Sequence, residues 1–293
     1  MTLTRTQAAA LLLDHGLAPR RALGQNFVVD PNTVWRIARL ADVGAGDRVV
    51  EIGAGLGSLT LALAATGAAV TAVEVDRHLV PMLRDVVADT DVRVIEGDAL
   101  TLDWDEVLAG PTAAATGASA APEPGVVPDR TDDRWVLVAN LPYNVATPLV
   151  LDLLDGVPAI ARMLVMVQRE AGERLAADVG DPAYGIPSVK VRYWATARLV
   201  GKVSPEVFLP RPRVESALVA ITRRDEPATD ADPDRLFALV RAGFGQRRKM
   251  LRRSLSGLVP PEAFTAAEVR PEARAEELGV EDWGRLAAAS PDA

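Results

Sequence analysis

Short apolar stretches alternate with longer amphipathic stretches along most of the chain. Five of the apolar stretches have the length and β-branched content of buried strands: residues 47–55, 69–76, 92–99, 134–142 and 161–168. The segments between them have helical periodicity. Strands that alternate with helices form βαβ units, so the pattern predicts an α/β fold in which helices cover both faces of a parallel sheet.

The region after residue 200 follows a different pattern. Two further β-type runs, 202–210 and 215–222, are joined through a Pro-Arg-Pro-Arg sequence and are expected to pair antiparallel at one edge of the sheet. A polar, proline-containing linker follows Arg224, and only helical patterns lie beyond it. We therefore expect an α/β domain over 1–224 and a small all-α C-terminal domain over 228–293.

One segment, residues 109–130, departs from both patterns. Of its 22 residues, 17 are Ala, Gly, Pro, Ser or Thr. Such a composition cannot bury enough apolar surface to offset the entropy lost on ordering the backbone. We expect a mobile insertion in a surface loop, without a catalytic role.

The composition narrows the class of protein. The 293-residue chain is 49% hydrophobic, enough for a sizeable core. It has no apolar run of the ~18 residues that a membrane span needs, and no signal-peptide cleavage site, so a cytoplasmic protein is expected. The absence of cysteine excludes disulfides and thiolate chemistry. His15 and His78 have no second ligand nearby, so no metal site is expected.

The charge is unevenly distributed. The net charge is −8, yet residues 241–253 hold six Lys or Arg and no acid. Such a cluster in isolation is typical of a solvated helix face. The alternative is a basic element that binds nucleic acid within an acidic protein.

A glycine-rich stretch, VVEIGAGLGSLT at 49–60, ends one predicted strand and begins a helix. Its glycines at 53, 55 and 57 follow a G-x-G-x-G spacing, which differs from the G-x-G-x-x-G of dinucleotide sites. Glu51 precedes the loop. Glu74 ends the second strand, where it can accept both ribose hydroxyls, and Asp98 follows the third, where it can contact an adenine edge. These groups meet at the carboxyl edge of a parallel sheet, which favours a nucleoside cofactor such as S-adenosylmethionine.

The fourth strand ends in Asn140-Leu141-Pro142-Tyr143. The Asn140 side-chain carbonyl and the Leu141 backbone carbonyl can accept the two hydrogens of an exocyclic base amine, and Tyr143 offers a ring on which the base stacks. Such a site would support methyl transfer by positioning and hydrogen bonding. Phe208 is the candidate for the other face of the base. The alternatives are an ordinary Asn-Pro turn and a core phenylalanine.

Taken together, these motifs resemble the KsgA-type small-subunit ribosomal RNA adenine dimethyltransferases over nearly the whole chain. The resemblance rests on nine stretches in the family's order: 19–28, 49–60, 72–76, 96–100, 140–144, 168–175, 184–189, 207–219 and 244–255. Val28 replaces the usual leucine and Met250 replaces a common threonine. The family implies a Rossmann-like class I methyltransferase domain with a small helical C-terminal domain, and transfer of four methyl groups to N6 of two adjacent adenosines near the 3′ end of 16S ribosomal RNA.

The resemblance also implies site residues. The cofactor contacts would be Asn26, Val28, Gly53, Glu74, Asp98 and Asn140. The target base would meet Asn140, Leu141, Tyr143 and Phe208. RNA would bind at the basic segment, through Arg247, Arg248, Lys249, Arg252 and Arg253, with Arg20 and Arg21 as helpers. The implied partner is 16S rRNA within the small ribosomal subunit, bound by a monomer. Two alternatives stay open: a 23S rRNA adenine methyltransferase of the erythromycin-resistance type, and a non-catalytic assembly factor on the same fold.

Overall fold

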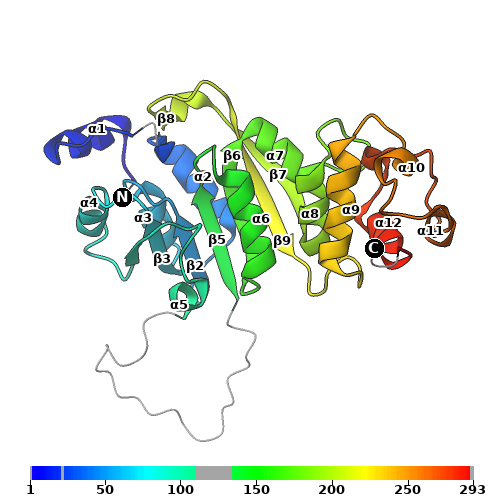
Figure 1. Ribbon diagram of the computed structural model, residues 1–293. Coiled ribbons are helices and arrows are strands. Elements are labelled where there is room, and N and C mark those ends of the chain that lie inside the picture. The colour runs from blue at the N-terminus through cyan, green and yellow to red at the C-terminus, as the bar shows by residue number, and fades with distance from the viewer. Residues whose placement is uncertain (1, 21–22, 110–133, 291–293) are drawn as a thin grey trace, which may run out of the picture.

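The computed structural model describes residues 2–20, 23–109 and 134–290 (Figure 1). The expected insertion at 109–130 therefore lies, except for Ala109, outside the described residues. Arg21, expected to help bind RNA, lies outside them as well.

A seven-stranded sheet forms the centre of the α/β part, in the order β4-β3-β2-β5-β6-β9-β7. The first five strands of that order are parallel, and β9 pairs antiparallel with both β6 and β7. The strands are β2 (Arg48–Ile52), β3 (Ala69–Glu74), β4 (Arg93–Glu96), β5 (Trp135–Asn140), β6 (Ile160–Gln168), β7 (Ala195–Val203) and β9 (Ser216–Arg223). All five strands predicted from the apolar stretches are confirmed.

Of the two runs predicted to pair antiparallel, 202–210 and 215–222, only the second is a strand of the main sheet over most of its length. The run 215–222 forms β9 as expected, but it pairs with β7 at 195–203 and lies one position inside the edge. Most of the run 202–210 is not in the main sheet. It supplies β8 (Phe208–Leu209), which pairs with β1 (Phe27–Val28) in a separate two-stranded sheet. The sequence did not reveal β7 because an edge strand keeps exposed polar side chains, such as Arg198 and Lys202, in place of an apolar run.

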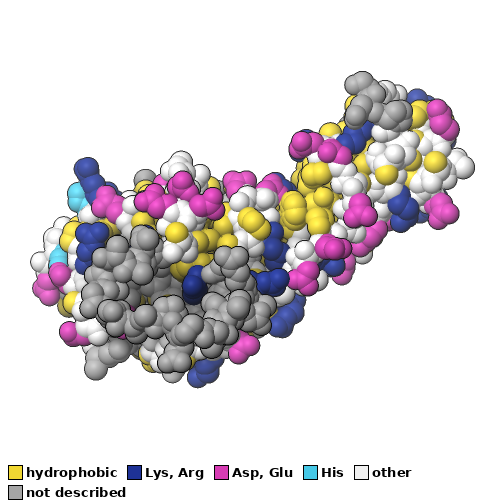
Figure 2. All heavy atoms as spheres, turned by 90° about the horizontal axis from the view of Figure 1, so that it is seen from below, with side chains coloured by type: hydrophobic (Ala, Val, Ile, Leu, Met, Phe, Trp, Pro, Cys, Tyr) yellow, Lys and Arg dark blue, Asp and Glu magenta, His cyan; other side chains and the backbone are white. Residues whose placement is uncertain are grey.

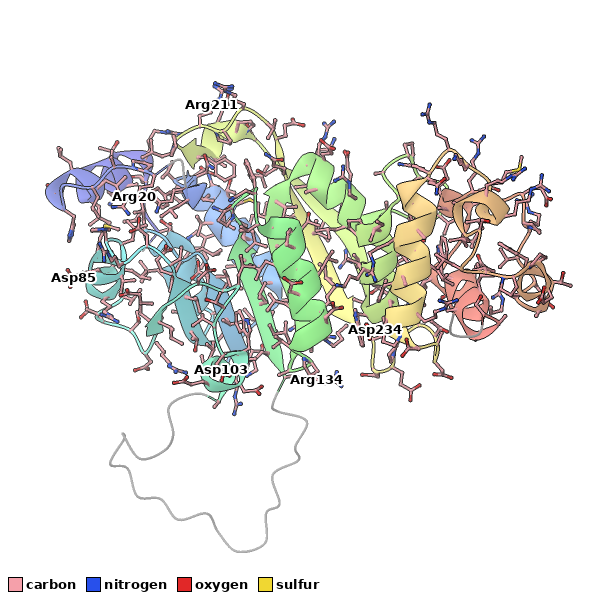
Figure 3. All side chains as sticks on the ribbon, viewed as in Figure 1. Arg20, Asp85, Asp103, Arg134, Arg211 and Asp234 are labelled. Atoms are coloured by element: carbon pink, nitrogen blue, oxygen red, sulfur yellow. The ribbon has the colours of Figure 1, made fainter. Side chains whose placement is uncertain are left out.

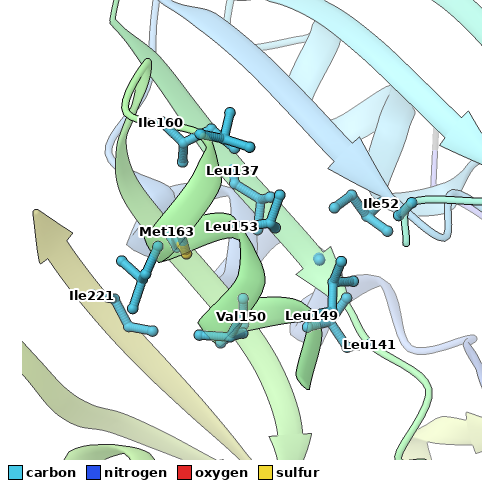
Figure 4. Packing of buried hydrophobic residues seen from close by; sticks show 14 of the residues in the cluster. Ile52, Leu137, Leu141, Leu149, Val150, Leu153, Ile160, Met163 and Ile221 are labelled. Carbon is cyan, nitrogen blue, oxygen red and sulfur yellow. The ribbon is translucent and has the colours of Figure 1, made fainter. Parts of the chain in front are cut away.

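Helices cover both faces of the sheet, as predicted. Buried residues of α2, α3 and α4 pack on one face, and those of α5, α6, α7 and α8 pack on the other. Strand β5 contacts both layers, because Val136 and Val138 point to the first and Leu137 and Ala139 to the second. A strand buried on both faces reads as a continuous apolar run. Figure 4 shows the second layer, where side chains of α6 cover β5 and β6. The helices are α2 (Pro31–Ala41), α3 (Ser58–Ala64), α4 (Val80–Val86), α5 (Trp104–Leu108), α6 (Ala146–Gly156), α7 (Arg169–Ala176) and α8 (Ile186–Trp194).

A 3-10 helix, η3 (Pro205–Val207), precedes β8, and the other described elements are α1 (Arg5–Asp14) and the C-terminal helices, which lie at the two ends of the molecule (Figure 1). Helix α1 begins at a capping box of Thr4 and Gln7. The C-terminal part contains α9 (Pro233–Gly245), α10 (Leu251–Ser254), α11 (Pro261–Ala266) and α12 (Val280–Ala288), with a short 3-10 turn, η4 (Ala275–Glu277). Figure 2 shows it as a lobe that projects from the α/β part.

The C-terminal helices do not have a core of their own. Their buried residues share one cluster with Tyr184, Val189 and Tyr193 from the α7–α8 region, whereas Val191 of α8 packs in the core of the α/β part. Helix α8 thus contributes to both cores, and the domain boundary between 224 and 228 stays a prediction. None of the described helices has the length and apolar content that crossing a bilayer requires.

Candidate active site

Three cavities follow one another along the carboxyl edge of the parallel strands, and all three are lined by Gly53. Their volumes are about 150, 60 and 30 Å³. The first lies over the ends of β3 and β4, the second over the ends of β2 and β5, and the third beside α2. Ligands of open α/β sheets bind at this edge. We call the three cavities together the groove.

The glycine loop forms the floor of the groove. Gly53 and Gly55 have φ of 73° and 56°, in the left-handed region that glycine adopts without strain. A Cβ atom at Gly55 would lie 2.9 Å from the Phe27 ring, and one at Gly53 would lie 3.6 Å from the Asn140 carbonyl oxygen. Glycine at both positions therefore lets the loop turn, and at Gly55 it also lets Phe27 of β1 approach the loop closely, whereas the contact at Gly53 is an ordinary one.

Glu74 fastens the loop to the end of β3. It is 4% exposed. One carboxylate oxygen accepts a hydrogen bond from the Gly55 backbone N–H at 2.7 Å, and the other accepts one from the Asp76 N–H at 2.9 Å. Burial raises the pKa of Glu74, while these two N–H groups oppose the rise. Each carboxylate oxygen has a second lone pair, so the predicted acceptance of ribose hydroxyls is compatible with this arrangement.

Glu51 lines the smallest cavity and is the most perturbed acid near the groove. It is 2% exposed, and its Oε2 atom has no hydrogen-bond partner among the described residues. Burial raises the pKa of Glu51 to about 8, although the neighbouring Thr60 hydroxyl lowers it; the Thr60 oxygen and the Glu51 Oε2 atom do not meet the geometry of a hydrogen bond. A buried carboxyl oxygen without a partner is costly in an isolated protein, which points to a ligand group as its partner.

Asp98 lines the first and largest of the three cavities of the groove, where an adenine contact was predicted. One of its carboxylate oxygens accepts a hydrogen bond from the Leu100 N–H at 3.0 Å. The same cavity is lined by Val75 and Leu100, whose exposed fractions of 47% and 46% are high for aliphatic side chains. We did not single out these two residues from the sequence. Only their positions in the sequence could have indicated a role, because Val75 lies one residue after Glu74 and Leu100 two residues after Asp98.

A residue outside β5, Asn26, determines the orientation of the Asn140 carboxamide. Its Nδ2 atom donates a hydrogen bond to the Asn26 backbone oxygen at 2.8 Å. Since only the amide nitrogen can donate to a carbonyl, the Oδ1 atom is the end left to accept hydrogens from a substrate amine. The next residue is equally constrained, because the Leu141 N–H donates to the Met166 oxygen at 3.0 Å and the Leu141 side chain is buried.

Tyr143 lies beside Asn140 and Leu141 in the second cavity. Its hydroxyl is 2.9 Å from the Ser216 hydroxyl, and Ser216 is fully buried at the start of β9. Burial raises the pKa of Tyr143, so the hydroxyl is held in its neutral form. No sequence pattern indicates this contact, because 73 residues separate the two side chains.

Phe208 does not reach the groove. It is fully buried, it pairs with Val28 across the small β1–β8 sheet, and both side chains belong to the core around α2 and α3. This position agrees with the alternative interpretation, in which Phe208 is an ordinary core residue. Base stacking by its ring stays a prediction. Val28 lines the smallest cavity, whereas Phe208 lines none of the three cavities.

Residues 23–26, which precede β1, line the second cavity of the groove. The Gln25 amide donates to the buried carboxylate of Asp76 at 2.9 Å, and Arg20 pairs with the same carboxylate at 3.5 Å. Gly24 packs on Pro142 so closely that an added Cβ would lie 2.9 Å from the proline Cβ. Arg20, expected to help bind RNA, is therefore held by Asp76. These contacts hold Asn26 against Asn140. The same segment therefore supports both the proposed cofactor site and the proposed site for the base amine.

A family model described as ribosomal RNA adenine dimethylase matches residues 16–290. The chain belongs to this family. It is 44% identical over 294 residues to a ribosomal RNA small subunit methyltransferase A from Bifidobacterium longum subsp. infantis, covering 94% of this chain and 89% of that protein. A protein of the same name from Thermobifida fusca is 43% identical, with 99% and 96% covered.

Solved structures give the same fold. The 23S rRNA methyltransferase ErmE superposes with a TM-score of 0.66 at 26% identity, covering 90% of this chain and 99% of that one. A dimethyladenosine transferase from Plasmodium falciparum superposes with a TM-score of 0.68 over 88% of this chain and 94% of its own, and at 22% identity this likeness shows the fold alone. The family members are methyltransferases with a Rossmann-like sheet, so the predicted fold class is confirmed.

The groove fits the cofactor that a methyltransferase of this family uses. S-adenosylmethionine has an adenosine part and a cationic amino-acid part. Val75 and Leu100 offer apolar walls and Asp98 an edge acceptor for the base, and Glu74 lies between them and the glycine loop. The unpartnered Glu51 oxygen suits a cationic ligand group at the other end. All six predicted cofactor residues line the groove: Asn26, Val28, Gly53, Glu74, Asp98 and Asn140.

The basic segment divides into two kinds of residue. Arg247 contacts Glu276 and also donates to the Pro182 oxygen at 3.1 Å, and Arg252 pairs with Glu272 at 3.1 Å. Arg248, Lys249 and Arg253 are exposed and make no ion pair or side-chain hydrogen bond within the described part of the chain. The sequence could not distinguish the two kinds, because the acids that pair with Arg247 and Arg252 come from η4 and the turn before it.

Proposed function

We propose that the protein transfers methyl groups from S-adenosylmethionine to N6 of two adjacent adenosines near the 3′ end of 16S rRNA, giving dimethyladenosines during late small-subunit maturation. The observation that carries the proposal is the orientation of Asn140, whose Nδ2 atom is held by Asn26 while its Oδ1 atom is left for an amine. The relatives named small-subunit methyltransferases are 43–44% identical to this chain, whereas the 23S rRNA methyltransferase ErmE is 26% identical. This difference supports 16S rRNA over 23S rRNA as the substrate.

The side chains of the site would act on the adenine amine in a defined order. Tyr143 holds the base by stacking, and its ring is held in turn by Ser216. The Asn140 Oδ1 atom and the Leu141 carbonyl accept the two N6 hydrogens, which draws the nitrogen lone pair out of conjugation with the ring. The bound cofactor supplies the methyl group. The two carbonyls then stabilise the positive charge that develops on N6, and the proton leaves afterwards, so that no general base is required.

The RNA would be held by phosphate contacts from the basic segment. We propose that Arg248, Lys249 and Arg253 make these contacts, because exposed cations without acidic partners are free to displace counterions from RNA. Arg247 and Arg252 were expected to bind RNA as well. Their ion pairs support a second role, which is to hold the segment against η4 and the α7–α8 loop. A cytoplasmic monomer is the form in which we expect the protein to act.

The test is mass spectrometry of rRNA fragments after incubation with S-adenosylmethionine and unmethylated ribosomal subunits, small and large separately. We expect a mass increase of four methyl groups confined to one 16S fragment that carries two adjacent adenosines. A product found only in 23S rRNA would refute the proposal in favour of the erythromycin-resistance type. Calorimetry of cofactor binding separates the third alternative, since an assembly factor without activity would show no binding heat.

A further inference from the structure

The loop between β8 and β9 ends at a residue that supports the proposed base site. Phe208 precedes it on the chain, and Ser216, the partner of Tyr143, follows it. The loop contains Arg211 and Arg213. Consecutive Cα atoms are about 3.8 Å apart, so the Cα of Arg213 lies within about 11 Å of the Cα of Ser216. Figure 3 shows Arg211 on the upper edge of the molecule, with its side chain directed into solvent.

The acidic residue of this loop has a close ionic partner, whereas its two arginines do not. Its acid, Glu215, pairs with Arg169 at 2.9 Å at the start of α7, so its charge is already compensated. Arg213 is exposed and has no partner within the described ranges. Arg211 reaches Glu206 only at 3.6 Å, with both side chains more than 60% exposed, a geometry that contributes little stability in water. The two arginines are therefore available to an external anion.

The same edge of the molecule carries the basic segment. Helix α9 begins near Asp234 at the lower edge and rises to the upper edge, where the segment follows it (Figures 1 and 3). Arg247 fixes the segment there by its bond to the Pro182 oxygen in the loop between α7 and α8. In the view of Figures 1 and 3, the β8–β9 loop, the start of α7 and the basic segment thus follow one another along the upper edge.

We propose that Arg211 and Arg213 bind phosphates of the RNA strand beside the target adenosine, and that the strand continues along this edge to Arg248 and Lys249. The inference rests on the proposed function and extends its RNA site beyond the basic segment. Arginine suits the task, because its planar fork binds a phosphate through two hydrogen bonds. Pro212 separates the two arginines and restricts the backbone between them, so less entropy is lost when they bind.

The first test compares salt dependence of binding to unmethylated small subunits. Each phosphate contact contributes about 0.7–0.9 to the slope of log K against log salt, so losing two lowers the slope by about 1.4–1.8. For the double variant Arg211→Ala/Arg213→Ala, we expect the loss of affinity to be about tenfold larger at 50 mM than at 200 mM salt. The control is Arg39→Ala/Arg198→Ala, which removes the same charge from exposed positions on α2 and β7. A slope equal to that of the control would overturn the inference.

The second test uses the absence of cysteine from the chain. A single Arg213→Cys substitution gives one attachment point for a benzophenone maleimide. We expect ultraviolet cross-links from position 213 to nucleotides that flank the two target adenosines, and none at those nucleotides from Arg39→Cys. Cross-links at other nucleotides, or equal yields from both positions, would overturn the inference.

The two proposals can fail separately. If the wild-type protein does not methylate small subunits, the proposed function fails. If it does, and if Arg248→Ala/Lys249→Ala lowers the salt slope while Arg211→Ala/Arg213→Ala does not, only the inference about the β8–β9 loop fails. A circular dichroism melt of each variant checks that the fold is retained, as expected because all four substituted side chains are exposed.

Discussion

Replacing Glu51 by glutamine should change how the stability of the protein depends on pH. The carboxyl is 2% exposed, and its burial raises its pKa to about 8, against 4.5 for a free glutamate. An acid whose pKa is raised on folding favours the folded state only while it is protonated. Its contribution is complete below pH 4.5 and is lost progressively as the pH rises to 8.

The magnitude follows from the difference between the two pKa values. A difference of about 3.5 pH units corresponds to about 5 kcal/mol at 1.36 kcal/mol per unit. About 3–4 kcal/mol of this is lost between pH 5 and pH 8, because the carboxyl is already about three quarters ionised in the unfolded chain at pH 5 and only half ionised in the folded protein at pH 8. Glutamine has the same shape and does not titrate. The free energy of unfolding of Glu51→Gln, minus that of the wild type, should therefore increase by about 3–4 kcal/mol over this range.

Urea unfolding followed by circular dichroism at half-unit steps from pH 5 to pH 8 measures this difference. Glu96→Gln is the matched control: it removes the same group from an exposed position at the end of β4, and the difference should stay within about 0.5 kcal/mol of a constant. A difference for Glu51→Gln that does not vary with pH would refute the reasoning. Adding S-adenosylmethionine should reduce the pH dependence of the wild type if the ligand supplies the missing partner of Glu51.

Four further single variants test the groove and the basic segment. Asn140→Ala should lower kcat about a hundredfold or more, while cofactor affinity measured by calorimetry persists in part; near-normal turnover would contradict the amine-orienting role. Ser216→Ala and Tyr143→Phe remove the same hydrogen bond, so each should lower kcat/KM by about twofold to tenfold and the double variant should be no worse than either; additive losses would separate the two residues. Arg247→Ala breaks the contacts with Glu276 and Pro182, so it should lower the melting temperature and leave the salt slope of RNA binding unchanged.

The sequence by itself determined the sheet and the residues at its carboxyl edge. Buried strands such as β5 are apolar throughout because both faces pack against helices, and this makes them readable without any structure. Each strand-end group could be placed at the same edge, because parallel strands bring their carboxyl ends together. Glu74, Asp98 and Asn140 were predicted on that ground, and all three line the groove.

Only the tertiary structure decided which partners these groups have. The contacts of Asn140 with Asn26 and of Tyr143 with Ser216 join residues 114 and 73 positions apart. Periodicity describes the surroundings of one element at a time, so it carries no information on such pairs. The same reason explains Phe208, whose place in the core depends on a pairing between β8 and β1. It also explains the basic segment, where acids from a separate turn determine which arginines are free.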